Sequence, residues 1–147
     1  MAYEERIKRK TSYTAAKEKR QEEKDMKNGK YEDSDGVKWY RNGLLHRNGG
    51  PAIECADGTK HWFIDGQYHR VDGPANEWPS GDRVWYVDGD LHREDGPAVL
   101  LEDGTSEWFL YGQPYTEVEF NRWLEKKALK EKLETLPQKS KDKKNKI

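Results

Sequence analysis

Apolar residues are scarce in this 147-residue chain. About 36% of the residues fall in the usual apolar set including glycine, whereas typical globular domains reach about 45–50%. We therefore expect one small domain with charged appendages rather than a globule with an ordinary core. No run approaches the roughly 18 apolar residues of a membrane-spanning helix, and the N-terminus lacks the apolar stretch of a signal peptide.

Cysteine occurs once, as Cys55, which excludes an internal disulfide framework. A reducing compartment such as the cytoplasm fits this usage best. No Cys/His cluster has the spacing of a zinc site, so we expect neither a metal nor another cofactor. No Ser/His/Asp or Cys/His set stands out as a nucleophile with its base, so the sequence favours a protein without enzymatic activity.

Charge of one sign is also lacking overall, because 27 Lys and Arg nearly balance 28 Asp and Glu. The distribution is uneven: residues 1–30 carry net +4, residues 31–115 net −9 and residues 116–147 net +4. An acidic middle repels phosphate, so any nucleic-acid contact would come from the basic ends.

Glycine is concentrated between Gly36 and Gly112, which hold 12 of the 13 glycines. In this region the sequence repeats itself every 23 residues. We expect the periodic tryptophans, histidines and prolines to be structural. The periodic residues are Trp39, Trp62, Trp85 and Trp108; His46, His69 and His92; Arg47, Arg70 and Arg93; and Pro51, Pro74 and Pro97.

Turn signals convert this period into a fold. Asn-Gly and Asp-Gly dipeptides favour tight type I′ hairpin turns, and a second glycine-containing turn recurs in each unit. The first set is Asn42-Gly43, Asp65-Gly66 and Asp88-Gly89, and the second is Asp57-Gly58, Ser80-Gly81 and Asp103-Gly104. Two turns per period predict two strands per period, and hence a mainly β antiparallel hairpin meander of about 3.5 repeats and about seven strands. Because proline cannot donate to a ladder, we expect a bulge or kink at Gly50-Pro51 and its equivalents.

Strand alternation predicts which side chains share a face. Arg83, Trp85 and Val87 should point one way, and Val84 and Tyr86 the other. Both faces are then rich in aromatic residues, so we expect another element to cover at least one of them.

A C-terminal helix is the expected cover. The stretch from Thr116 to Glu119 matches a capping box, and apolar residues then recur at spacings of three and four until Pro137. These signals predict a capping helix over about 117–135.

The chain therefore divides into four expected segments. They are a basic N-terminal segment (1–30), a β-hairpin repeat domain (31–115), the capping helix (116–136) and a basic tail (137–147). Both charged ends should be weakly helical or disordered in isolation.

The unit that runs from Trp85-Tyr86-Val87-Asp88-Gly89 to His92-Arg93-Glu94-Asp95-Gly96-Pro97-Ala98 resembles a repeat of tailed bacteriophages and large DNA viruses. It is more distantly similar to MORN repeats. The resemblance covers roughly residues 36–121. It implies an interaction scaffold that is encoded by a phage, works in the host cytoplasm and binds a host protein.

We expect the partner to contact the periodic arginines and the exposed aromatic side chains. These residues are Arg47, Arg70, Arg93, Tyr40, Phe63, Tyr86 and Phe109. A metal site is disfavoured because equivalent histidines lie two strand spacings apart, about 9.5 Å, too far to share one ion. The His-Arg pair should instead hydrogen-bond into the Asp-Gly-Pro turn, with Asp72 and Asp95 pairing with the arginines.

Two alternative functions stay open. One is a nucleic-acid-associated accessory protein that uses its basic ends, and the other is a virion structural component. Neither end has the apolar face of a membrane-binding helix, so we expect no membrane contact. The sequence leaves the partner and the oligomeric state open.

Overall fold

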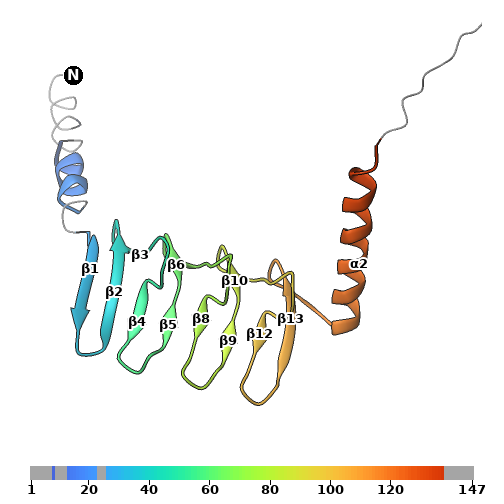
Figure 1. Cartoon of the computed structure of the whole chain (residues 1–147). Helices are drawn as coiled ribbons and strands as arrows, with labels where there is room; N and C mark the ends of the chain where they lie inside the picture. The colour runs from blue at the N-terminus through green and yellow to red at the C-terminus, as the bar shows by residue number, and fades with distance from the viewer. Residues whose placement is uncertain (1–7, 9–12, 23–25, 138–147) are drawn as a thin grey trace, which may run out of the picture.

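The computed structural model describes residues 8, 13–22 and 26–137. They form a mainly β protein with one large antiparallel meander and a C-terminal helix, as predicted (Figure 1). Residues 13–22 are helical and lie at the other end of the sheet. The predictions for residues 1–7, 9–12 and 23–25 of the N-terminal segment and for residues 138–147 of the basic tail lie outside the described residues.

The large sheet has the strand order β1-β2-β4-β5-β8-β9-β12-β13-β14, with β3 paired to β2. Two short hairpins, β6-β7 and β10-β11, stand beside it. The strands are β1 (Gly29–Asp33), β2 (Gly36–Arg41), β3 (Leu44–Leu45), β4 (Ile53–Cys55), β5 (Lys60–His61), β6 (Phe63–Ile64), β7 (Gln67–Tyr68), β8 (Asn76–Glu77), β9 (Arg83–Val84), β10 (Tyr86–Val87), β11 (Asp90–Leu91), β12 (Val99–Leu100), β13 (Ser106–Leu110) and β14 (Gln113–Tyr115).

The Asn-Gly and Asp-Gly turns, which lie at the upper ends of the hairpins in Figure 1, have the predicted type I′ character. Asn42, Asp65 and Asp88 adopt φ values of 51°, 47° and 50°, and each is followed by a glycine that also has positive φ. A fourth such turn holds Tyr111, with φ 49°, where a residue other than glycine, asparagine or aspartate is strained.

The strands are shorter and more numerous than the predicted seven. The ladder is interrupted at Trp62 and Trp85, whose N–H groups instead donate to Ala75 and Ala98. The return segments bend at residues 48–50, 71–73 and 94–96, directly before the prolines. The predicted kink is therefore present. It divides each long hairpin into a lower and an upper part because proline has no N–H for the ladder.

The core is thin. The buried apolar side chains of the described residues are Ala52, Phe63, Ala75, Val84, Ala98, Leu110 and Phe120. The three periodic alanines have no exposed surface at all, and each follows the bend and accepts a backbone hydrogen bond from the tryptophan of its own hairpin.

Helix α2 (Glu117–Glu134) begins with the predicted capping box. The Thr116 hydroxyl accepts from the Glu119 N–H at 3.2 Å, and the Glu119 carboxylate accepts from the Thr116 N–H at 2.9 Å. As predicted, α2 caps the end of the sheet, where it contacts the last strands β13 and β14. It then rises away from the sheet, so the expectation that it covers a face is wrong (Figure 1). Phe120 is its one buried residue, while Leu129 and Leu133 are exposed.

The sheet starts slightly before the expected boundary at residue 31, since β1 begins at Gly29 and pairs with β2 along its whole length. Among the described helices, none is long and apolar enough to cross a membrane.

Candidate functional site

A row of stacked tryptophan and arginine side chains runs across one face of the sheet. The guanidinium carbons of Arg47, Arg70 and Arg93 lie 3.8, 3.9 and 3.9 Å from the ring centres of the tryptophans eight residues earlier. Those tryptophans are Trp39, Trp62 and Trp85. We call this side the Trp–Arg face. Each stack contributes about 0.5–2 kcal/mol, depending on how far it is shielded from water.

The Gly-Pro pair of each unit positions the arginine. Arg70 Nη1 donates to the Pro74 carbonyl at 3.1 Å, and the same bond recurs from Arg47 and Arg93. A Cβ atom on Gly73 would lie 2.8 Å from the Arg70 guanidinium carbon, so only glycine leaves room for this approach. In the motif His-Arg-x-x-Gly-Pro, the glycine and the proline carbonyl therefore form a binding position for the arginine's own guanidinium group.

Aspartate carboxylates also bind the guanidinium group in two of the three units. Arg70 Nε donates to Asp72 at 3.0 Å, and Arg93 Nε donates to Asp95 at 2.8 Å. These are the expected pairs, and both aspartates are largely exposed. Such exposed pairs contribute about 0–1 kcal/mol each, so they orient the guanidinium more than they stabilise the fold.

The histidines do not bond into the Asp-Gly-Pro turn as we expected. His46, His69 and His92 each accept, through Nδ1, the backbone N–H of a residue 19 positions later at 2.9–3.0 Å. The donors are Asp65, Asp88 and Tyr111, each the first residue of the next unit's hairpin turn. The histidine thus connects neighbouring units, whereas the arginine organises its own.

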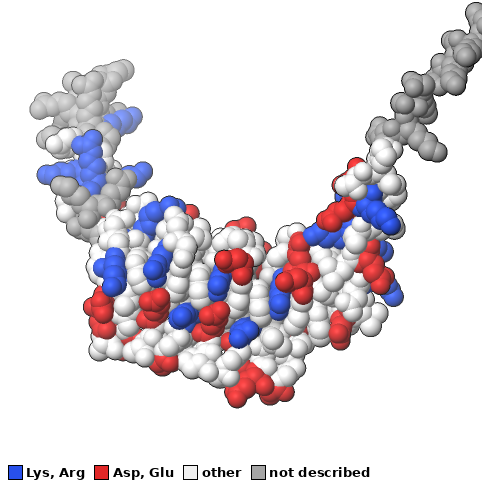
Figure 2. All heavy atoms as spheres, viewed as in Figure 1, with Lys and Arg blue, Asp and Glu red and all other residues white. Residues whose placement is uncertain are grey.

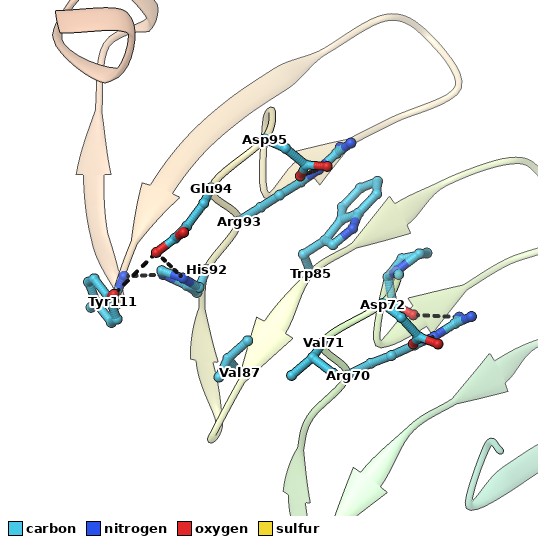
Figure 3. Close-up of a pocket in the computed structure, with 12 residues that line it drawn as sticks. Arg70, Val71, Asp72, Trp85, Val87, His92, Arg93, Glu94, Asp95 and Tyr111 are labelled. Carbon is cyan, nitrogen blue, oxygen red and sulfur yellow. Dashed lines mark hydrogen bonds and ion pairs between the residues drawn. The ribbon is translucent and has the colours of Figure 1, made fainter. Parts of the chain in front are cut away.

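Two equivalent grooves separate the stacks. One is about 630 Å³ and is lined by Trp85, Val87 and His92 on one side and by Arg70, Val71 and Asp72 on the other (Figure 3). The second, about 410 Å³, lies one unit earlier, with Trp62, Ile64 and His69 in the equivalent positions. The Arg70–Asp72 segment is the wall that both share. Val71, 81% exposed, stands on this wall.

Charges of both signs border these grooves. Figure 2 shows Lys and Arg alternating with Asp and Glu across the face in view. At the end of the larger groove Glu94 accepts a hydrogen bond from Lys127 of α2, and this bond is the largest cause that lowers the pKa of Glu94. Tyr111 also donates to Glu94, at 3.3 Å. Glu94, which lines the groove, is thereby tied to the helix.

The opposite face carries a second aromatic row, which we call the Tyr face. Tyr31 meets Tyr40 edge to face at 5.5 Å, and Tyr68 packs between Phe63 and Tyr86 at 4.2 and 5.0 Å. Phe63 is only 8% exposed. Burial also raises the pKa of Tyr86 above its ordinary value.

The residues expected to form one partner surface therefore separate. Alternation places Arg47, Arg70 and Arg93 on the Trp–Arg face and Tyr40, Phe63, Tyr86 and Phe109 on the Tyr face. Phe63 belongs to the core rather than to an exposed surface. The arginines alone of this set line the grooves.

Sequence reasoning missed three residues of this region. Val71 falls at a variable position of the unit, Tyr111 replaces the usual Asn or Asp of the turn, and Tyr68 replaces Leu45 and Leu91. Departure from an otherwise strict period was the available signal for Tyr111 and Tyr68, whereas Val71, at a variable position, carried none. Lys127 carried no such signal, because its partner Glu94 is 33 residues away.

The side chains that could bind a metal or take part in catalysis are dispersed. Across residues 8, 13–22 and 26–137, no group of three or more His, Cys, Asp or Glu side chains could hold a metal ion. Burial is the main cause that raises the pKa of the Cys55 thiol, which disfavours the thiolate. An off-period pair, His61 Nδ1 and Asn76 Oδ1 at 2.7 Å, is part-buried within the sheet.

Comparison with known proteins adds no identification. No family model matches the chain, and no curated protein or solved structure matches it significantly.

Proposed function

We propose that this protein is a non-enzymatic binding module that holds an extended segment of another protein across its Trp–Arg face. The observation that carries this proposal is the pair of equivalent grooves that share the Arg70–Asp72 wall. Each combines an aromatic side chain, an aliphatic side chain and charged groups already held in ion pairs, and apolar lining with a few placed polar groups is typical of binding sites.

Groove spacing indicates the conformation of the bound segment. Equivalent grooves are two strand spacings apart, about 9.5 Å. A polyproline II helix rises about 3.1 Å per residue with three residues per turn, so every third side chain points the same way at intervals of about 9.3 Å. If a segment in that conformation ran across the strands, every third side chain would lie in the next groove. Aromatic-lined grooves recognise such segments in other proteins.

The resemblance to phage repeats supplies the biological setting of this proposal. The partner would be a host protein in the bacterial cytoplasm, bound by a phage-encoded, distantly MORN-like repeat array. The mixed charge of the grooves suits a partner that carries both apolar and basic residues, since the region from 31 to 115 is net −9.

Affinity capture from host lysate tests this proposal when it is combined with a matched pair of variants. Val71→Lys places a charge on the shared wall, and Val118→Lys makes the same change on α2 at a side chain that is 67% exposed. We expect the wild-type chain and Val118→Lys to retain one partner, Val71→Lys to lose it, and short overlapping peptides of that partner to bind directly. Equal capture by all three chains, or no capture by the wild type, would overturn the proposal.

A nucleic-acid accessory role is the second candidate, and the basic ends are the observation that favours it. The three periodic arginines are engaged with tryptophan rings and carbonyl groups, and the region from 31 to 115 is net −9, so the basic ends are the better source of phosphate contacts. A gel-shift assay with single- and double-stranded DNA and RNA, with and without residues 1–12 and 138–147, tests this role. Binding that depends on these ends and weakens steeply with salt would support it.

A further inference from the structure

The two outer edges of the sheet are protected differently. The last strand, β14, contains Pro114, which has no N–H to donate, and it leads directly into α2. The first strand, β1, contains no proline, and all five of its residues are exposed. Among the described residues, no strand pairs with its outer side (Figure 1). A sheet edge of this kind offers its backbone groups to another strand.

Backbone hydrogen bonds of the neighbouring strand show which groups are offered. Lys30 lies opposite Trp39 in the β1-β2 ladder. Trp39 donates its N–H to Ala52 at 2.8 Å and accepts from the His46 N–H at 3.0 Å, both on the side away from β1. Lys30 and Trp39 are therefore a non-hydrogen-bonded pair, and the N–H and C=O of Lys30 face the free edge. Glu32, two residues later, faces the same way.

The side chains of β1 are self-complementary in one antiparallel register. When two copies of β1 pair about Tyr31, Lys30 of each copy lies opposite Glu32 of the other. The same register pairs the residues that offer backbone groups, for about four hydrogen bonds in all. A shift of two residues in either direction sets lysine opposite lysine or glutamate opposite glutamate. Charged residues at an edge usually oppose pairing, but these two favour the register with full overlap and oppose the two registers next to it that also match the backbone groups.

We propose that β1 is the interface of a homodimer, in which a second copy of this chain extends the sheet by antiparallel pairing across a two-fold axis at Tyr31. In the monomer Lys30 and Glu32 pair with each other at 3.5 Å, and in the dimer each gains the oppositely charged residue of the second copy. Tyr31, 43% exposed and in contact with Tyr40, continues the Tyr face across the axis.

This arrangement closes at two chains. A two-fold contact uses the same patch on both copies, and the proline of β14 together with α2 protects the outer edges that remain. Both Trp–Arg faces then lie on the same side of one continuous sheet, which doubles the number of grooves available to a partner. The dimer does not depend on the proposed function.

Sedimentation equilibrium of the full-length chain, over concentrations up to about 1 mM, tests the dimer. We expect the mass to rise from 17.3 kDa toward twice that value. Lys30→Glu and Glu32→Lys each create two like-charged cross-strand pairs, so each variant should remain a monomer. The double variant that carries both changes restores two opposite pairs and should dimerise like the wild type.

The charge reversal also predicts a result that no structural defect could imitate. A mixture of the two single variants brings two glutamates opposite two lysines, so these separately monomeric chains should form a heterodimer. Both side chains are more than half exposed, and circular dichroism checks that each variant is folded. A wild-type mass of 17.3 kDa at every concentration, dimers of the single variants, or no complex in the mixture would each overturn the proposal.

Discussion

Histidine and arginine are adjacent in the motif but act on different units. The arginine is seated on its own tryptophan and its own proline carbonyl. The histidine instead accepts the first N–H of the following turn, a group that a type I′ turn leaves free to bond outside the hairpin. The arginine of each His-Arg pair therefore organises its own unit, and the histidine connects that unit to the next.

Removal of one histidine acceptor should destabilise the sheet. His69→Leu removes the acceptor of the exposed Asp88 N–H, and we expect a loss of about 0.5–1.5 kcal/mol in the free energy of unfolding. His69→Asn keeps an acceptor at a similar distance from the backbone and should lose clearly less. Urea unfolding of both variants measures the difference. Equal losses would show that packing of the ring, not this hydrogen bond, matters.

The alanine of the Gly-Pro-Ala triplet is fully buried in all three units. Ala75 has no exposed surface, donates to the Val84 carbonyl at 2.9 Å and accepts from the Trp62 N–H at 2.8 Å. A larger side chain has no space there without moving the strands apart.

Enlargement of this alanine should cost more than enlargement of an exposed one. We expect Ala75→Leu to lower the free energy of unfolding by about 1–3 kcal/mol through overpacking. Ala56→Leu, at an exposed alanine, is the matched control and should change little. Chemical denaturation monitored by tryptophan fluorescence compares the two variants, and similar losses in both would argue against a close-packed bend.

Helix α2 owes its position to few contacts. Its capping box fixes where it starts, Phe120 anchors its first turn, and the Glu94–Lys127 ion pair attaches its middle to the third unit. Leu129 and Leu133, which the apolar stripe assigned to a covering role, are 59% and 60% exposed. The apolar stripe predicted the helix correctly but not its packing. The helix starts at the last strand and points away from the sheet, so its apolar side chains do not reach either face of the sheet.

Stability should depend on pH through Glu94. The Lys127 hydrogen bond lowers the pKa of Glu94 below its ordinary value of 4.5. A carboxylate with a lowered pKa in the folded state stabilises the fold above its unfolded pKa, and this contribution is lost as the pH falls through the folded value. Glu94→Gln should therefore be less stable than the wild type near about pH 7 and approach it near about pH 3.

Thermal unfolding at the two pH values measures this effect. Glu125→Gln, on an exposed position of the same helix, is the control and should follow the wild type at both. A constant gap between Glu94→Gln and the wild type would contradict the assignment of the ion pair.

At the scale of the whole molecule, the described residues form an open, one-layer sheet. Only seven apolar side chains among these residues are buried. Stability must then come mainly from contacts between sequential neighbours, as in other solenoid-like arrays. An open sheet also explains how a chain with so few apolar residues folds at all.

The free energy of unfolding should therefore depend only weakly on the concentration of urea. Because little surface is newly exposed on unfolding, we expect a urea m-value below about 1.5 kcal/mol/M, in the lower part of the range for small proteins. Equilibrium unfolding monitored by circular dichroism provides the m-value. A value near about 3 kcal/mol/M would indicate a more compact fold than the one described.

Local signals in the sequence were enough to predict the hairpins, the meander and the helix with its cap. Turn dipeptides, strand alternation and a capping box act over a few residues, so each could be recognised without knowledge of the neighbouring unit. Strand alternation also places neighbouring aromatic residues on opposite faces. The partner of each histidine and the exposed position of the helix depend on how successive units lie beside one another. Those features arise from contacts between residues about one period or more apart, and the distance between such residues is set only once the strands have paired.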